Sequence, residues 1–211
     1  MKTLDTITAL PDGALTSPAA RRNSNAILSV LRAHLPARGS LLEIASGSGE
    51  HAVTFATALP GMNWTPSDPS AEARASIAAW AQQAVVANVL PALPLDAADT
   101  STWPTGPFDA IFCANMTHIS PWSATEGLMD LAGRVLRRPG GLLALYGPYR
   151  EAEVPLAASN AAFDDSLKSR NPAWGLRDRA AVEALAKSHG LAATLRIEMP
   201  ANNLMLLFRR F

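Results

Sequence analysis

The sequence contains one cysteine, Cys113, among its 211 residues. A single thiol cannot form an intramolecular disulfide or supply a multi-cysteine zinc site. Its neighbours Ile111, Phe112 and Ala114 are apolar, so we expect a buried and unreactive thiol within a strand. The four histidines show no metal-ligand spacing, and no metal site is expected.

Long apolar runs and an excess of one charge are also missing. No stretch approaches the roughly eighteen apolar residues of a membrane span, and the N-terminus lacks the pattern of a secretory signal. These absences predict a cytoplasmic protein. The 18 basic and 18 acidic residues give a formal net charge of zero. Nucleic-acid binding relies on an excess of positive charge, so we expect no nucleic-acid partner and instead expect a small-molecule substrate. A homodimer is left open.

The length suits a single domain. Residues 1–20 are interrupted by proline and glycine and are expected to form an N-terminal arm. Residues 21–211 would then form one domain. Within it, residues 147–177 are rich in proline, asparagine and tryptophan. We expect this segment to be an irregular, lid-like insertion, because long loops in compact domains are usually functional.

Apolar patterning predicts strands that alternate with helices. The expected helices cover residues 23–35, 50–59, 70–85, 124–136 and 178–189, and the expected strands cover 41–45, 62–67, 89–95, 108–114, 142–146, 192–198 and 204–209. Such alternation indicates parallel βαβ units in an open α/β sheet with helices on both faces. The last two strands have no helix between them, which predicts an antiparallel ending. A Rossmann-like, seven-stranded, mostly parallel sheet with one antiparallel strand is the class I methyltransferase arrangement.

A glycine loop follows the first strand of this sheet. Ligands of open α/β sheets bind at the carboxyl ends of the strands, and Gly47 and Gly49 would permit close backbone approach there. Asp68 ends the next strand, where a carboxylate can accept hydrogen bonds from both hydroxyls of a ribose. Together the loop and the acid predict an adenosyl ligand. The alternative is a tight turn and a helix start with no ligand.

The identity of the nucleoside depends on the residues beside the loop. A dinucleotide fingerprint has a third glycine, where this chain has Ala52. Glu43 precedes the loop, and its carboxylate would repel a pyrophosphate but would attract a sulfonium or ammonium group. These residues favour S-adenosylmethionine over NAD.

Six segments carry a resemblance to a known family: EIASGSGEH at 43–51, PSDP at 66–69, NMTHISPW at 115–122, LYGPY at 145–149, RNPAWGLRD at 170–178 and MPANN at 199–203. With these segments the chain resembles the methyltransferase-like 26 family, formerly a domain-of-unknown-function family, from about Arg22 to the C-terminus. The resemblance implies a class I methyltransferase fold that uses S-adenosylmethionine and releases S-adenosylhomocysteine. It supplies no substrate.

The resemblance and the position in the fold imply a set of cofactor-binding residues. They are Glu43, Ala45, Ser46, Gly47, Gly49, His51, Asp68, Pro69, Asp96, Asn115 and Met116. Asp68 would bind the ribose with Pro69 against the adenine, and Asp96 would accept from the adenine amino group. Asn115 and Met116 would line the sulfonium end. Ala45 departs from the family pattern, because it stands where methyltransferase loops usually have their first glycine.

Methyl transfer requires proximity and alignment more than a catalytic triad, and the sequence shows no triad. His118 follows the fourth strand and is the first candidate for a general base, because its ordinary pKa lies near 6.5. Tyr146, after the fifth strand, is the second candidate catalytic residue. The alternative for His118 is a bond that ties its loop to a backbone carbonyl, and the alternative for Tyr146 is packing.

Candidate substrate-binding residues lie in the lid-like segment: Tyr149, Asn160, Arg170, Trp174 and Arg177. The two arginines could hold a carboxylate or phosphate, or could form salt bridges with neighbouring aspartates. The sequence thus predicts an S-adenosylmethionine-dependent methyltransferase that acts on a small molecule. The alternatives are a non-catalytic protein of the same fold that binds the cofactor or a partner, and an NAD-linked oxidoreductase.

Overall fold

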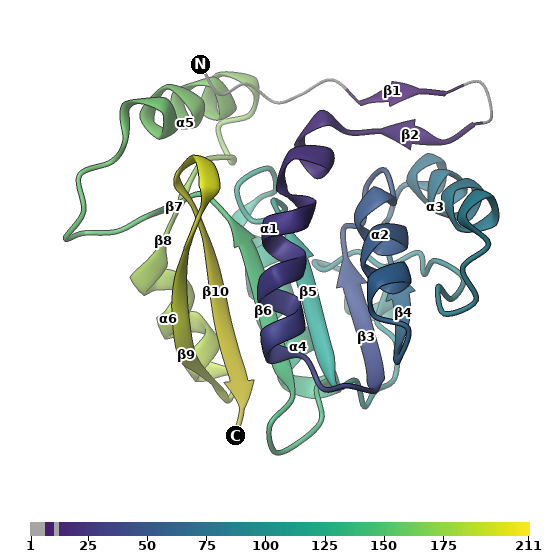
Figure 1. The fold of residues 1–211 in the computed structure, drawn as a ribbon. Helices are drawn as coiled ribbons and strands as arrows, with labels where there is room; N and C mark the ends of the chain where they lie inside the picture. Colours follow the sequence, from purple (N-terminus) through teal and green to yellow (C-terminus); the bar gives the residue numbers. More distant parts are fainter. Residues whose placement is uncertain (1–6, 11–12) are drawn as a thin grey trace.

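The protein has a central mixed sheet with helices on both faces, as a computed structural model shows (Figure 1). The structure describes residues 7–10 and 13–211. The expected N-terminal arm therefore lies partly outside the described residues. Within the described part of the chain, no helix combines the length and apolar character needed to cross a membrane.

The helices and strands have the following bounds. The helices are α1 Pro18–His34, α2 Glu50–Ala58, α3 Ala71–Ala84, α4 Trp122–Val135, α5 Ala158–Arg170 and α6 Arg179–Ser188. The main sheet contains β3 Gly39–Ile44, β4 Met62–Pro66, β5 Ala110–Ala114, β6 Leu142–Gly147, β9 Leu191–Met199 and β10 Asn203–Arg210. Two short pairs stand apart from it, β1 Thr8–Ala9 with β2 Leu15–Thr16, and β7 Tyr149–Arg150 with β8 Arg177–Asp178.

The main sheet has the order β4-β3-β5-β6-β10-β9. Neighbours from β4 to β6 pair in parallel, and β10 is antiparallel to both β6 and β9. The predicted α/β alternation and the antiparallel ending are confirmed. The connection out of β3 leads to β4 on one side, and the connection out of β4 leads back past β3 to β5 on its other side. The carboxyl ends of β3 and β5 therefore meet at a topological switch point, where ligands of such sheets bind.

The predicted count of seven strands is wrong for the described residues, where this sheet has six strands. The expected strand over residues 89–95 forms only two isolated parallel bridges with the region of β4, Trp64 with Val89 and Ser67 with Leu93. Pro91 and Pro94 lack the backbone N–H that a continuous ladder needs.

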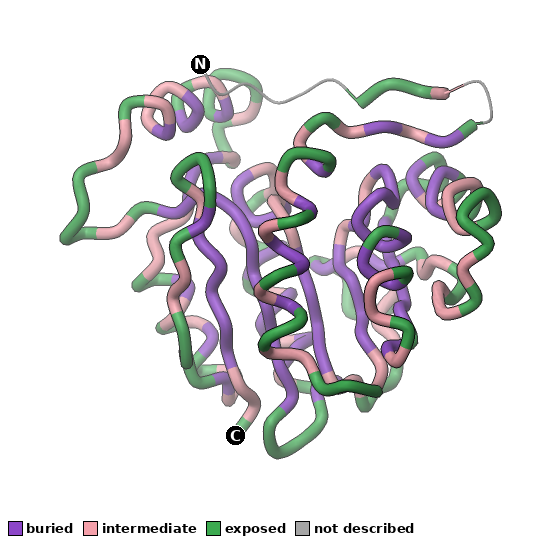
Figure 2. Tube along the Cα trace, in the orientation of Figure 1, coloured by how far each residue is buried: buried purple, intermediate pink, exposed green. Residues whose placement is uncertain are grey.

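Two apolar cores lie on opposite faces of the sheet. Side chains of α1 and α2, such as Ile27 and Phe55, pack on one face. Side chains of α4 and α6, such as Leu128 and Val182, pack on the other. Figure 1 shows α1 in front of the sheet and α4 and α6 behind it, and Figure 2 shows that the strands between them are largely buried. Cys113 is buried, as predicted, in the core on the face covered by α4 and α6. Burial raises the pKa of its thiol to about 12.

Helix starts follow local capping chemistry. Ser70 caps α3 by accepting from Ala73 N at 3.3 Å, and Asp178 caps α6 by accepting from Ala181 N at 2.9 Å. Both boundaries were predicted. Helix α1 begins five residues before the predicted Asn23, because Ser17 provides the cap and Pro18 suits the first helical position.

The prediction of an irregular segment over residues 147–177 is wrong for its central part, which forms α5. The buried positions of α5 follow helical spacing, at Asn160, Phe163, Asp164 and Leu167. Two of these four side chains are polar, so the apolar pattern that signals an amphipathic helix is missing.

Candidate cofactor and acceptor site

The loop between β3 and α2 forms a backbone cradle. Ala45, Gly47 and Gly49 have φ values of 54°, 57° and 87°. A Cβ on Gly49 would lie 2.8 Å from the Cα of Ile77, whereas a Cβ on Gly47 would meet no atom within 4 Å. Gly49 is therefore required by packing against α3. Gly47 faces open space, and its missing side chain leaves room for a ligand to approach the backbone.

Asp68 joins the end of β4 to this cradle. Its carboxylate accepts from Gly47 N at 3.0 Å and from Ser70 N at 2.9 Å. The residue is only 9% exposed. An ionised carboxylate offers about four lone-pair sites, so acceptor capacity remains beyond these two bonds. A buried acceptor next to an open glycine cradle fits the ribose hydroxyls of an adenosyl group.

Glu43 lies at the end of β3 and is 2% exposed. Burial raises the pKa of its carboxyl to about 8, although hydrogen bonds from Trp64 and Ser46 oppose the rise. The indole Nε1 of Trp64 donates to its Oε2 at 2.7 Å. At neutral pH the carboxyl is therefore largely protonated, and a cation placed beside it would favour the ionised form. Such a group fits a positively charged ligand.

His51 follows the loop in the first turn of α2, and its side chain contacts α1. Its Nε2 is 2.7 Å from Asn23 Oδ1, and its ring stacks on Phe55 at 5.0 Å between centroids. Burial lowers the pKa of His51 to about 4, which keeps the ring neutral. These contacts give His51 a role in holding α1 to α2 next to the predicted cofactor loop.

The remaining residues of the predicted cofactor set follow β3, β4 and β5. Ser46 exchanges hydrogen bonds with Ser67, at 2.8 Å and 3.1 Å. Asn115 has a φ of 62°, donates its N–H to Tyr146 O at 2.8 Å, and precedes the buried Met116.

Pro69 and Asp96 lie nearer the surface. The carbonyl of Pro69 accepts from Arg74 at 2.8 Å. The carboxylate of Asp96 accepts from Ala98 N at 2.9 Å, and its carbonyl accepts from the indole of Trp103 at 3.1 Å.

A pocket of about 530 Å³ adjoins the end of β5. Asn115 and both candidate catalytic residues, His118 and Tyr146, line it. His118 is 2% exposed. A Cβ on Gly147 would lie 3.3 Å from His118 Nδ1 and 3.7 Å from Asn115 Oδ1, so these side chains lie close together over Gly147. Asn115, which is predicted to lie at the sulfonium end of the cofactor, and His118, the candidate base, thus line the same cavity.

Tyr146 carries its phenol into a polar cluster at this pocket. Asn203 Nδ2 donates to Tyr146 Oη at 2.9 Å. Burial raises the pKa of Tyr146, while hydrogen bonds with Asn23 and Asn203 and the charge of Arg22 oppose the rise. The phenol is neutral at physiological pH and suits hydrogen bonding to a ligand.

The two arginines predicted to bind substrate lie away from this pocket's lining. Arg177 donates to the carbonyls of Thr117 at 2.8 Å and Ser120 at 2.5 Å, and its guanidinium lies over the ring of Trp122. It therefore holds the loop between β5 and α4 in place. Arg170 is exposed at the end of α5.

The other three predicted substrate-binding residues also lie outside the lining of the 530 Å³ pocket. Trp174 packs against the small core formed by Phe163 and Leu167. Tyr149 and Asn160 line a separate pocket of about 240 Å³. The segment over residues 147–177 thus reaches the larger pocket through Pro148 and through Phe163 of α5 rather than through the side chains that were predicted.

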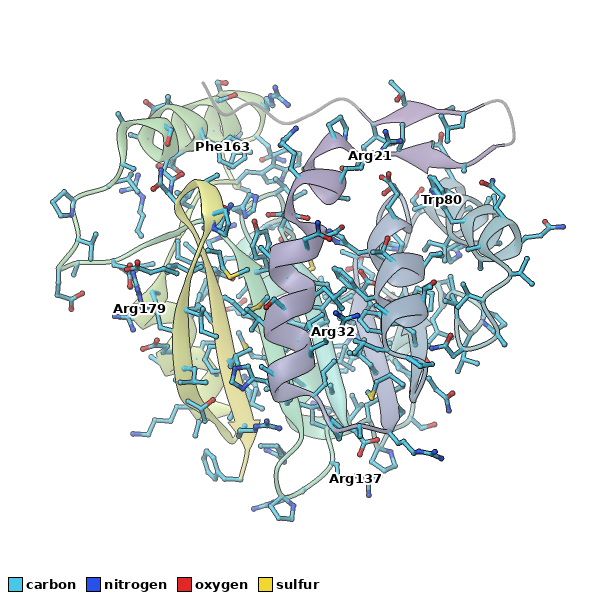
Figure 3. All side chains as sticks on the ribbon, in the orientation of Figure 1. Arg21, Arg32, Trp80, Arg137, Phe163 and Arg179 are labelled. Atoms are coloured by element: carbon cyan, nitrogen blue, oxygen red, sulfur yellow. The ribbon has the colours of Figure 1, made fainter. Side chains whose placement is uncertain are left out.

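Sequence reasoning missed the pocket's contribution from α1. Arg22 and Asn23 line the pocket, but the predicted helix began only at Asn23, and no local pattern marked either residue. Figure 3 shows Phe163 on α5 and Arg21 at the N-terminal end of α1, both near the carboxyl ends of the parallel strands.

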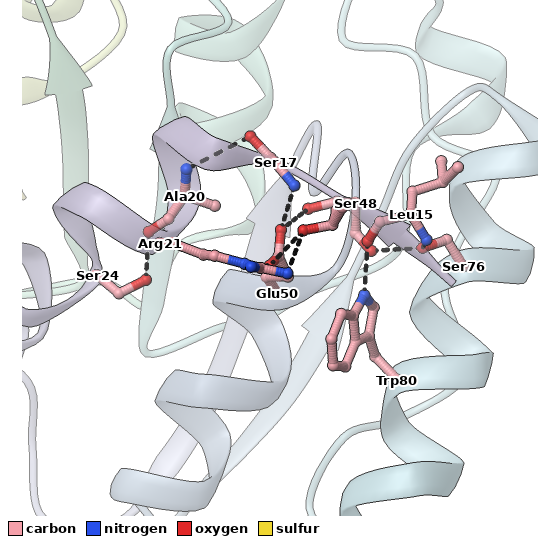
Figure 4. A network of polar contacts seen from close by, with 10 residues as sticks. Leu15, Ser17, Ala20, Arg21, Ser24, Ser48, Glu50, Ser76 and Trp80 are labelled. Atoms are coloured by element: carbon pink, nitrogen blue, oxygen red, sulfur yellow. Dashed lines mark hydrogen bonds and ion pairs between the residues drawn. The ribbon is translucent and has the colours of Figure 1, made fainter. Parts of the chain in front are cut away.

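A hydrogen-bonded network fastens the segment before α1 to α2 and α3 (Figure 4). The carboxylate of Glu50 accepts from Ser17 N at 2.5 Å and from Arg21 Nε at 3.0 Å. On the neighbouring helix, Ser76 Oγ accepts from Leu15 N at 2.7 Å, and Trp80 Nε1 donates to Leu15 O at 2.8 Å. The network sets the position at which α1 begins, and with it the wall that α1 gives to the pocket.

Solved structures similar to this chain include methyltransferases. An O-methyltransferase family protein from Burkholderia thailandensis matches with a TM-score of 0.77 and 16% identity, over 91% of this chain and 57% of that one. CalO1, a methyltransferase in calicheamicin biosynthesis solved with S-adenosylhomocysteine bound, matches with a TM-score of 0.72 and 17% identity, over 89% and 54%. YcgJ from Bacillus subtilis matches with a TM-score of 0.69 and 16% identity, over 90% and 98%.

These similarities show that the chain has the α/β fold of the methyltransferases. The chain spans little more than half the length of the first two proteins. Residues 15–210 match the model of a family described as "Protein of unknown function (DUF938)". Since the match covers nearly the whole sequence, the chain belongs to this family.

Proposed function

We propose that the protein is an S-adenosylmethionine-dependent methyltransferase that acts on a small molecule. The observation that carries the proposal is the pocket of about 530 Å³ that begins at Asn115, at the switch point of a methyltransferase-like sheet. Similar structures that are methyltransferases, one with S-adenosylhomocysteine bound, support it. The resemblance to the methyltransferase-like 26 family is part of this proposal.

The cofactor would lie along the carboxyl ends of β3, β4 and β5. The cradle at Gly47 would hold its methionine part, and Asp68 would accept from the ribose hydroxyls, with the adenine between Pro69 and Asp96. The positive end of the ligand would favour the ionised form of Glu43, which would then offer it a carboxylate. Bound there, S-adenosylmethionine supplies a methyl group already activated by a sulfonium.

The chain's own residues would then orient the acceptor and handle its proton. His118 lies beside Asn115, at the predicted sulfonium end, and would accept a proton from the acceptor. Tyr146 and Asn203 would hold the acceptor by hydrogen bonds, and Phe163 would exclude water. Alignment of the two reactants can supply much of the acceleration in a displacement of this kind.

The proposal is tested by incubating the protein with methyl-labelled S-adenosylmethionine and a panel of small acceptors, with S-adenosylhomocysteine release as the readout. We expect turnover with at least one acceptor. His118→Ala should lower turnover by about 10²-fold or more while cofactor affinity stays unchanged. His34→Ala, at the far end of α1, is the matched control.

Two outcomes would replace the proposal. Cofactor binding without turnover on any acceptor would indicate a non-catalytic binding protein of this fold. Binding of NAD in place of S-adenosylmethionine would indicate an oxidoreductase.

A further inference from the structure

The loop between β5 and α4 carries His118, and a later stretch of the chain holds the backbone of this loop on both sides of that residue. The guanidinium of Arg177 donates from Nε to Thr117 O at 2.8 Å and from Nη2 to Ser120 O at 2.5 Å. Between these two bonds, Gly175 N donates to His118 O at 3.0 Å. The carbonyls before, at and after His118 are therefore bonded to one short stretch of chain.

The guanidinium of Arg177 is itself held in place. Its Nη2 also donates to Ala173 O at 2.9 Å, and its central carbon lies 5.7 Å from the ring centroid of Trp122, the first residue of α4. Burial lowers the pKa of Arg177, and the charge of Asp164 opposes this fall. Hydrogen bonds from a partly desolvated cation are stronger than those from an exposed one. The planar fork of an arginine can hold two carbonyls at once, which the ammonium of a lysine does less well.

A buried carboxylate ties the same stretch of chain to α5. Asp164 is 0% exposed, and its Oδ1 accepts from Leu176 N at 2.8 Å. Its Oδ2 forms ion pairs with two basic side chains. A Cβ on Gly175, whose φ is 143°, would lie 2.8 Å from Asp164 Oδ1, so this close approach depends on a glycine. The residues that hold the loop are thus fastened to α5.

The imidazole of His118 is enclosed by its neighbours. Its ring meets the ring of Phe163, on α5, edge-on at 5.6 Å between centroids. It also lies close to Gly147, where a Cβ would be 3.3 Å from His118 Nδ1. The residue is 2% exposed. A group that moves a proton must be held to within about 0.5 Å of its working geometry, and backbone bonds on both sides of the residue serve that purpose.

We propose that Arg177 is a positioning residue, which fixes the backbone on both sides of His118 so that the imidazole stays in the lining of the 530 Å³ pocket beside Asn115. The meaning of this position for catalysis rests on the proposed methyltransferase function, whereas the hold on His118 does not. A guanidinium bonded to three backbone carbonyls acts on the acceptor through the histidine, in contrast to the direct substrate contact that the sequence predicted.

The hold on the loop is measured by the rate at which diethyl pyrocarbonate modifies each histidine of the protein alone, followed by peptide mass spectrometry. His118 must leave its buried position to react, so its rate reports how often the loop opens. His51 is also buried, at 7% exposed, and lies on α2. Its rate reports opening of the fold elsewhere.

Arg177→Gln should raise the modification rate of His118 by about tenfold or more, because two charge-assisted bonds to the loop are lost. The rate of His51 should stay unchanged. Arg177→Lys keeps the charge but not the fork, and should give a smaller rise. Arg134→Gln is the matched control, because this guanidinium also lies over a tryptophan, Trp103, at 5.5 Å, but on the exposed surface of α4. It should leave both rates unchanged.

Kinetics with the first acceptor of the small-molecule panel that turns over separate positioning from substrate binding. A misplaced base lowers turnover without weakening binding, so Arg177→Gln should lower kcat by about 10–100-fold. The KM for the acceptor and the affinity for S-adenosylhomocysteine should stay unchanged, and Arg177→Lys should retain more of kcat. A raised KM with an unchanged kcat would show that Arg177 binds the acceptor directly, which would overturn the inference.

Two results with diethyl pyrocarbonate would also overturn it: an unchanged rate for His118 in Arg177→Gln, or a parallel rise for His118 and His51. The proposed function fails separately. If no acceptor turns over, that function is contradicted, and the modification rates still decide whether Arg177 holds His118. Turnover that Arg177→Gln leaves intact would support the proposed function and would contradict the positioning role.

Discussion

Glu43 combines deep burial with an ionisable group. Its carboxyl is held by the indole of Trp64 at 2.7 Å and is 2% exposed. Burial raises its pKa from 4.5 to about 8, because a desolvated carboxylate is costly. The positive charge of a ligand placed beside such a carboxyl would offset the cost of ionising it. Glu43 is therefore a candidate ligand-binding residue of the proposed cofactor site.

The same burial predicts a pH dependence of stability. The folded state keeps the Glu43 proton that the unfolded chain loses above pH 4.5, so the free energy of unfolding falls as the pH rises to about 8. His51 acts in the opposite sense between pH 6.5 and about 4, since the folded protein takes up its proton only near pH 4. Of these two residues, only Glu43 contributes between pH 6.5 and 8.

Urea unfolding across pH 6.5 to 8 should therefore show a decline to which Glu43 contributes about 2 kcal/mol. Glu43→Gln should remove that contribution, because a carboxamide does not titrate. Glu126→Gln, an exposed site on α4, should keep the decline. A parallel decline in the Glu43→Gln protein would show that another group causes it.

At the scale of elements, one buried carboxylate accepts hydrogen bonds from both the start of α1 and the residue that caps it. Glu50 is 7% exposed and accepts from Ser17 N and Arg21 Nε. Glu50→Gln keeps the shape of the side chain but removes its charge. We expect the free energy of unfolding to fall by about 1–3 kcal/mol, the scale of charged hydrogen bonds at a buried group.

Urea unfolding measures that change, with Glu72→Gln in the first turn of α3 as the control. Glu72 is exposed, and its replacement should alter stability by less than about 0.5 kcal/mol. Equal losses in the two variants would show that the network around Glu50 does not stabilise the fold.

Elements with local signals could be predicted from the sequence, and elements that depend on distant partners could not. Ser70 and Asp178 were recognised as caps because capping is decided within four residues. Helix α5 was missed because its buried Asn160 and Asp164 are polar, and Asp164 is paired with residues such as Lys168 at 2.7 Å. Residues 89–95 do not form the expected continuous strand, because Pro91 and Pro94 lack the backbone N–H groups that strand pairing requires.

At the scale of the whole molecule, the cofactor loop and the pocket differ in how far they follow from the sequence. The loop at Gly47 and the acid Asp68 belong to one βαβ unit, and their 3.0 Å hydrogen bond agrees with the predicted proximity. The pocket joins residues as far apart as Asn23, Phe163 and Asn203. Their meeting depends on how α1, α5 and the β9–β10 turn pack, which no local pattern encodes.

The central claim is that this fold binds S-adenosylmethionine between the glycine loop and Asp68. The most direct measurement is calorimetric titration of S-adenosylmethionine and S-adenosylhomocysteine into the unmodified protein, Asp68→Ala, and the surface control Asp130→Ala. We predict saturable binding that weakens by about 10²-fold in Asp68→Ala, as expected for two lost hydrogen bonds to a carboxylate, and that is unchanged in Asp130→Ala. No binding by the unmodified protein, or equal binding by Asp68→Ala, would contradict the account.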